Sequence, residues 1–192
     1  MPATRGPRQL QDEITSLATT KHEAPSWALA TQPGTAAEML QISKVLINSR
    51  LYSQFGTPQG IFAVLQLGRE LGLGTAASLQ GFFVVQNRPF ASSALLRALV
   101  QKHPDCAYFI CTNSDEKSAT FELRRKSWPE GMKSSLTYTW EQAVTAKLTT
   151  GANAENWRTK PTEMLSKTAA AKLARREFAD ATLGLHTEAE ID

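Results

Sequence analysis

The spacing of apolar residues changes along the chain, and this change constrains the fold more than any other feature of the sequence. Between residues 36 and 71, apolar side chains recur every three or four positions, as on amphipathic helices. Between 82 and 139, with one helical interval at 93–103, they fall in short runs separated by polar turns, which is typical of antiparallel strands. Helical spacing then returns. Helices on both sides of short consecutive strands predict the α+β class.

Two capping patterns predict where the first helices begin. Thr35 followed by Glu38 matches a capping box, in which each side chain accepts a backbone hydrogen bond from the other residue. We expect that helix to cover residues 36–54. A threonine-proline step at 57–58 places proline at the first position of a second helix, which should stop at Gly72.

We expect the strands to form a small antiparallel sheet, a hairpin followed by a three-stranded meander, packed with about five helices. The hairpin comprises the apolar run "LQGFFVV", a turn at 86–88 and a return strand broken by Pro89. The meander consists of "CAYFICT", "SATFELRR" and "SLTYT". Polar residues between these runs supply its turns.

Three further helices complete the prediction. Ser92 or Ser93 caps a helix that Pro104 ends. Thr139 caps a short helix that runs to about Leu148. After the loop "TTGANAEN", a basic helix follows.

Several classes of protein are excluded by composition. Residues 1–30 are polar and lack the apolar stretch of a signal peptide, and no run approaches the ~18 apolar residues of a membrane helix. The two cysteines, Cys106 and Cys111, fit buried free thiols in a reducing cytoplasm. With three scattered histidines and no CxxC, a structural zinc site is not expected.

No enzyme signature is found. The glycine-rich run "GRELGLGT" lacks the lysine of a phosphate-binding loop, and its Gly72 ends a helix instead of opening one. The strand "SATFELRR" offers only Glu122 where a metal-dependent nuclease would need converging acids. The pair Ser92-Ser93 has no GxSxG context. We therefore predict a protein with no catalytic residues, no metal and no cofactor.

The segment "WRTKPTEMLSKTAAAKLARREF" stands out by its charge and its alanines. From 158 to 176 it holds six cations and one acid, a local net charge of +5, while the whole chain carries +3. Projected at ~100° per residue, Thr168, Lys172, Arg175 and Arg176 share one sector beside an alanine-lined surface. Such a ridge would let a polyanion approach closely. The alternative is an ordinary surface helix of good helix formers.

This segment resembles the C-terminal block of the RecT family of phage single-strand annealing proteins, which includes the lambda Red beta protein. Upstream, "GRELGLGTAASLQGFFVVQNRPFASSALLRALVQKHP" and "TYTWEQAVTAKL" resemble the family's hairpin block and short helix. Together the similarity covers about residues 36–190. In the C-terminal block it is carried by Trp157, Pro161, Met164-Leu165, Lys167-Thr168, Ala174-Arg175 and Phe178.

The resemblance implies ATP-independent binding of single-stranded DNA and its annealing to a complementary strand in homologous recombination and DNA repair. It also implies a ring or helical filament with a shared basic groove, and a phage or prophage gene expressed in the bacterial cytoplasm. Aromatic side chains of this chain could stack on DNA bases, although strand alternation lets only one of Phe82 and Phe83 face outward. The predicted DNA-binding residues are Lys160, Lys167, Lys172, Arg175, Arg176, Arg88, Arg97 and Trp157.

We expect a flexible arm over 1–34, one annealing core domain over 35–182, and a short acidic tail over 183–192. The expected partners are single-stranded DNA, the annealed duplex intermediate and further copies of the chain, with no membrane. In Red beta a further small domain contacts a phage exonuclease and the host single-strand-binding protein. The sequence carries no counterpart of that domain, so we assign neither partner.

Two other functions remain open at this point. A single-stranded DNA-binding replication accessory protein would coat DNA and resist pairing. A sequence-specific regulator would place the helices at 36–54 and 57–71 in a major groove, where only Lys44, Arg50 and Arg69 could contact DNA.

Overall fold

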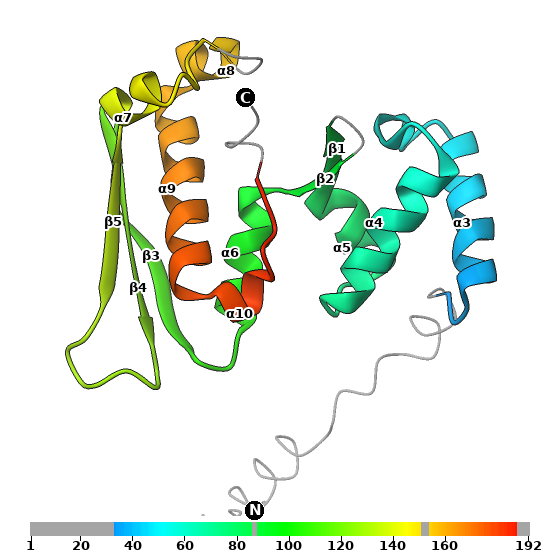
Figure 1. The fold of residues 1–192 in the computed structure, drawn as a ribbon, viewed down its shortest axis with the longest axis horizontal. Helices are drawn as coiled ribbons and strands as arrows, with labels where there is room; N and C mark the ends of the chain where they lie inside the picture. The colour runs from blue at the N-terminus through cyan, green and yellow to red at the C-terminus, as the bar shows by residue number, and fades with distance from the viewer. Residues whose placement is uncertain (1–32, 86–87, 151–153, 188–192) are drawn as a thin grey trace, which may run out of the picture.

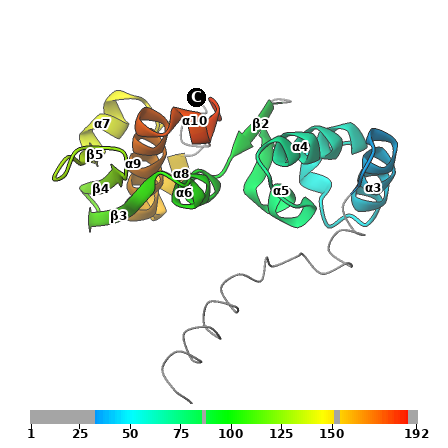
Figure 2. The ribbon, with the colours of Figure 1, turned by 90° about the horizontal axis from the view of Figure 1, so that it is seen from below.

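The computed structural model describes residues 33–85, 88–150 and 154–187, which form a helical body and a sheet body (Figures 1 and 2). The helical body contains α3 (Ala36–Asn48), η1 (Ser53–Phe55), α4 (Pro58–Glu70), α5 (Thr75–Gly81) and the hairpin of β1 (Phe82–Val85) and β2 (Arg88–Ala91). The sheet body contains the remaining elements. The α+β class, the hairpin and the three-stranded sheet are therefore confirmed.

The two predicted helix starts are correct. Thr35 and Glu38 form both hydrogen bonds of the capping box, and the Thr57 side chain accepts from the Gly60 N–H. The first helix ends at Asn48, earlier than predicted, because Arg50 adopts a left-handed backbone with φ +61°. The chain then turns so that Phe55 is buried.

Helix α5 was not predicted from the sequence. It is only seven residues long, and the run "TAASLQG" lacks a helical apolar pattern. Its position depends on Gly68 of α4, because a Cβ on that glycine would lie 1.9 Å from the Ser78 hydroxyl oxygen. The two helices therefore pack at a distance that only glycine permits.

In the hairpin, Phe82 pairs with Ala91 and Phe83 with Phe90. Phe82 is buried, while the Phe83 ring lies on the other face and stacks on Phe90 with 6.0 Å between ring centroids. The alternation predicted for the two phenylalanines is confirmed. Of the predicted turn, residues 86 and 87 lie outside the described part of the chain.

The sheet body is built on three antiparallel strands in the order β3-β4-β5, namely β3 (Cys106–Ser114), β4 (Ser118–Arg125) and β5 (Ser134–Thr139). Helix α9 (Pro161–Glu177) lies along one face of the sheet, and α6 (Ser93–Lys102) packs on α9 and β3 (Figures 1 and 2). Helices α7 (Trp140–Thr145) and α8 (Ala154–Thr159) lie near the start of α9. As predicted, Thr139 and Gln142 cap α7, whereas Cys111, expected to be buried, is exposed.

The alanines of α9 are covered by protein, so the predicted open surface for DNA is wrong. Ala169, Ala170, Ala171 and Ala174 are each 1% exposed or less. Thr168, placed in the cationic ridge, is 1% exposed, and its hydroxyl donates to the Met164 carbonyl. Small side chains let α9 lie close to the sheet and to α6 at once.

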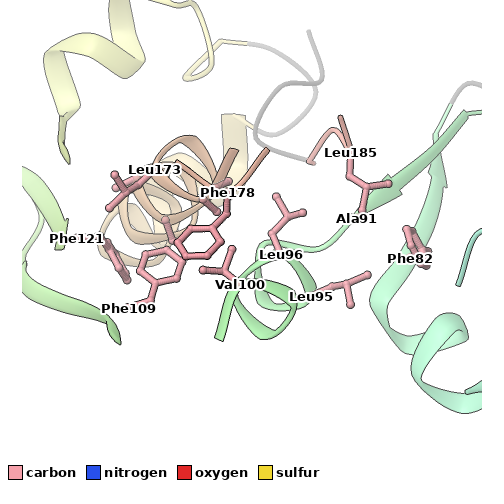
Figure 3. Packing of buried hydrophobic residues seen from close by; sticks show 14 of the residues in the cluster. Phe82, Ala91, Leu95, Leu96, Val100, Phe109, Phe121, Leu173, Phe178 and Leu185 are labelled. Carbon is pink, nitrogen blue, oxygen red and sulfur yellow. The ribbon is translucent and has the colours of Figure 1, made fainter. Parts of the chain in front are cut away.

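The two bodies are joined at the end of β2 and by the C-terminal segment that follows α10 (Ala179–Thr182). The Ala91 N–H donates to the His186 carbonyl at 2.8 Å, and Thr187 pairs with Ala91 as an isolated parallel bridge. Figure 3 shows Leu185 beside Ala91, between Leu96 and Phe82. Of the expected tail, Leu185 and Thr187 are thus buried, whereas Leu183 is exposed. Residues 188–192, and 1–32 of the expected arm, lie outside the described residues.

Candidate nucleic-acid interface

Helix α9 and strand β5 lie side by side and run in opposite directions, and their shared border carries the exposed cations. Arg176, near the end of α9, contacts Ser134 and Ser135 at the start of β5. At the other end, Thr139 of β5 and Pro161 of α9 line one hollow. We define the α9–β5 seam as this border, formed by Pro161, Lys172 and Arg176 with Ser134, Ser135, Tyr138 and Thr139.

The helical repeat aligns the seam residues of α9. Pro161 and Lys172 are eleven residues apart, about three turns, and Arg176 is one further turn along. All three therefore face β5. At ~1.5 Å per residue, the 17 residues of α9 give the seam a length of roughly 25 Å.

Arg176 is held at the seam by hydrogen bonds within the chain. Its Nε donates to Glu177 Oε1 at 2.7 Å, and its terminal Nη2 donates to the Ser134 hydroxyl at 2.7 Å and the Ser135 carbonyl at 3.1 Å. The guanidinium is nevertheless about half exposed. It is positioned as a fixed charge, although Glu177 offsets part of that charge.

Lys172 is the most available cation of the seam. It is exposed, and its Nζ lies 5.4 Å from the centre of the Tyr138 ring, a cation–π distance. Burial raises the pKa of the Tyr138 hydroxyl, so the ring stays neutral. Within the described residues Lys172 makes no ion pair with an acid. Its charge can therefore be offered to a ligand.

The other predicted cations of this region do not all face the seam. Lys167 is half-buried and lies five residues before Lys172, roughly 140° around the helix, so it points away from β5. Arg175 is half-buried on the last turn. Lys160 is exposed and is the residue that precedes α9. Arg158, another exposed cation of the basic segment, forms a two-pronged ion pair with Glu155.

Arg97 and Arg88 lie apart from the seam. The guanidinium of Arg97 is 5.4 Å and 5.9 Å from the rings of Phe121 and Phe109, on the side of the sheet body where α6 packs. Its buried Nε has no hydrogen-bond partner among the described residues. Arg88 is exposed at the start of β2. The structure therefore does not bring all the predicted residues into one patch.

The predicted tryptophan faces the interior. Trp157 is 1% exposed, and its ring packs edge-on against Trp140, with 6.1 Å between centroids. Trp140, which sequence reasoning passed over, is the half-buried member of this pair. Its position directly after the Thr139 cap was the available signal, because a residue at the start of a short helix has fewer neighbours.

Sequence reasoning also missed a cation with several partners among the described residues. Arg125 donates to Asp105, to both carboxylate oxygens of Asp180 and to the Glu177 carbonyl, and its guanidinium lies 4.0 Å from the Phe178 ring centre. The hydrogen bond from Arg125 lowers the pKa of Asp180, and hydrogen bonds from Ser127 and then Arg125 lower that of Asp105. This arginine is committed to the fold.

Neither a metal site nor a membrane span is present in the described ranges. No group of three His, Cys, Asp or Glu side chains there could hold a metal ion. None of the described helices is long and apolar enough to cross a bilayer. Among the described residues, the seam is one surface where exposed cations and hydroxyl groups meet.

The comparison with protein families matches the part of the chain that contains this seam. A model described as the RecT family matches residues 74–192, more than half of the chain, from the residue before α5 through the hairpin, the sheet and α9. No curated protein matches the chain significantly. The chain therefore belongs to the RecT family, and that membership implies a single-strand annealing protein of DNA recombination, not a catalytic enzyme.

Proposed function

We propose that the protein binds single-stranded DNA along the α9–β5 seam and anneals it to a complementary strand without ATP. The observation that carries this proposal is the alignment of Lys172 and Arg176 on one face of α9, beside the hydroxyl groups of β5. Cations and hydroxyls are the groups that contact phosphate and sugar. Lys160 and Arg175 extend the contact, whereas Lys167, Arg88 and Arg97 would require DNA to leave the seam.

Annealing imposes a requirement that this arrangement meets. The strands must read each other, so the protein must hold phosphates and leave the base edges free. Cations on a rigid helix can do this, and release of counterions from the DNA supplies affinity independent of sequence. A protein that read bases would compete with the incoming strand.

We propose that several copies share one strand. A seam of roughly 25 Å spans about seven nucleotides at the ~3.4 Å spacing of one duplex strand. Stable pairing of longer sequences therefore needs adjacent protomers, in a ring or a helical filament. Light scattering should show a mass above that of the monomer, increasing with DNA, and a strictly monomeric mass in both samples contradicts the assembly.

The main alternative is a protein that coats single strands without pairing them. Mixing two complementary oligonucleotides, one with a fluorophore and one with a quencher, separates the functions. The protein should accelerate quenching in the absence of ATP. Slower quenching than in buffer would support the coating function, and binding to preformed duplex alone would support a regulator.

A further inference from the structure

A hollow of about 750 Å³ lies at the end of the seam where α9 begins. Its lining includes Trp140 and Pro161 together with two cations, Lys117 and Arg158, and two acids, Glu116 and Glu141. This volume falls in the ~300–1,000 Å³ range of small-ligand pockets. The hollow plays no part in the phosphate contacts proposed above.

The Trp140 ring is held in place before any ligand arrives. Its backbone N–H donates to the Lys117 carbonyl at 2.8 Å, and the capping box of Thr139 and Gln142 fixes the start of α7 around it. The buried Trp157 supports the ring edge-on at 6.1 Å. One part of the ring stays exposed toward the hollow. A rigid, partly exposed aromatic surface is suited to stacking.

The charges that line the hollow select the kind of ligand. Two cations and two acids line it, and Arg158 is also paired with Glu155, so the hollow has no excess of positive charge. A phosphate would gain little there and would be repelled by Glu116 and Glu141. A neutral, planar and partly polar group is favoured, and nucleobases have this chemistry.

We propose that this hollow binds one nucleobase of the single strand held in the seam, stacked on Trp140. The inference rests on the proposed function, because the seam delivers the strand to the hollow. Pro161 belongs to both, so a strand running from Arg176 past Lys172 arrives at the hollow directly. One base in each protomer would thus be held out of the stack and would fix the register of the strand on the protein.

The test compares two single-stranded ligands of equal length, a mixed-sequence oligonucleotide and an abasic oligonucleotide that keeps the sugar-phosphate backbone. The wild-type protein should bind the first about 5- to 100-fold more tightly, the range expected for stacking of one base. Trp140→Ala should remove most of this preference and leave the salt dependence of binding unchanged. Trp140→Leu, which keeps an apolar group against Trp157 but has no ring, should do the same.

A matched control and a second measurement decide each outcome. Trp128→Leu changes another half-buried tryptophan, in the β4–β5 connection, and should keep the preference. Folded Trp140 variants that keep the preference overturn the base site, whereas a wild-type protein that binds neither ligand overturns the proposed function itself. If both Trp140 variants unfold, photo-cross-linking of a bromouracil oligonucleotide to the wild-type protein decides, since cross-links that never include Trp140 also overturn the site.

A competition experiment identifies the source of the base. A free mononucleotide should displace the oligonucleotide only at concentrations far above that of the strand, because it lacks the phosphate contacts of the seam. Displacement at equal concentrations would make a free nucleotide the occupant and overturn the assignment to a bound strand.

Discussion

Lys172 on α9 and Arg125 at the end of β4, beside that helix, show two opposite uses of a positive charge. Arg125 is 17% exposed and surrounded by Asp105, Asp180 and the Glu177 carbonyl, so its charge is neutralised within the fold. Lys172 is exposed, rests on the neutral Tyr138 ring and has no acidic partner among the described residues. The partners of a cation, and not its place in a basic sequence, therefore indicate whether it can bind DNA.

The largest effect is expected from Arg125→Ala. Removing the guanidinium takes a hydrogen-bond donor from Asp180 and from the Glu177 carbonyl, and with it a link between α10 and β4. Asp105 loses one donor but keeps its hydrogen bonds from Ser127. We expect a loss of roughly 2 kcal/mol in the free energy of unfolding, below the ~3–5 kcal/mol of a fully buried pair because Asp180 is half exposed. Urea unfolding measures it, with the exposed Lys44→Ala as a control that should change stability by less than about 0.5 kcal/mol.

Two results would contradict the assignment of Arg125 to the fold. A stable Arg125→Ala variant would show that the carboxylates find water or other donors at no cost. A stable variant with weaker DNA binding would be more damaging, because it would make Arg125 a DNA contact. We expect the folded fraction of the variant to keep the salt dependence of the wild-type protein.

In the wild-type protein, acid should remove the stability that the ion pairs of Arg125 contribute. Asp105 and Asp180 have lowered pKa values in the fold, so their contribution to stability is present above the ordinary aspartate pKa of ~3.9. It is lost as pH falls below that value toward the folded pKa. The difference in urea midpoint between the wild-type protein and Arg125→Ala should therefore be largest at pH 7 and smaller at pH 3. A difference that grows in acid would show that Arg125 stabilises the fold through groups other than these two aspartates.

The order of the longer elements was predictable because its signals are local, whereas the short helix α5 was missed. Thr35–Glu38 and Thr57–Pro58 fix helix starts through hydrogen bonds and backbone geometry within a few residues. The environment of α9 was not predictable in this way. Its buried side chains lie on nearly all sides of the axis, and a helical projection does not tell an alanine that packs on a sheet from one that faces solvent.

The same limit applies to the candidate site. Trp140 and Trp157 are equivalent as sequence features, yet the first is half-buried and the second is fully buried. The seam itself could not be derived from α9 alone, because its second side is β5, more than twenty residues earlier in the chain. Strand and helix meet there only through the tertiary fold.

Lys172→Ala tests the other half of the comparison and should have a smaller effect. Loss of one phosphate contact should reduce the slope of log affinity against log salt by roughly 0.7, about equally for every single-stranded sequence. The fold should hold, since alanine is the better helix former and no acid loses a partner. Lys44→Ala, on the outer helix α3, is the matched control and should leave the slope unchanged. An unchanged slope in Lys172→Ala would remove the seam from the binding surface.

Arg175→Ala should give the smallest change and the sharpest distinction between the two uses of charge. Arg175 is half-buried and lies three residues from Lys172, about 60° around the helix, so it borders the seam without facing β5. As a DNA contact at the border, it should change the salt slope by less than the ~0.7 of a full phosphate contact. The midpoint of thermal unfolding measures separately what Arg175 contributes to the fold. A lower midpoint with an unchanged slope would place Arg175 with Arg125 among the cations committed to the fold, and the DNA-binding surface would then depend on Lys172, Arg176 and Lys160 alone.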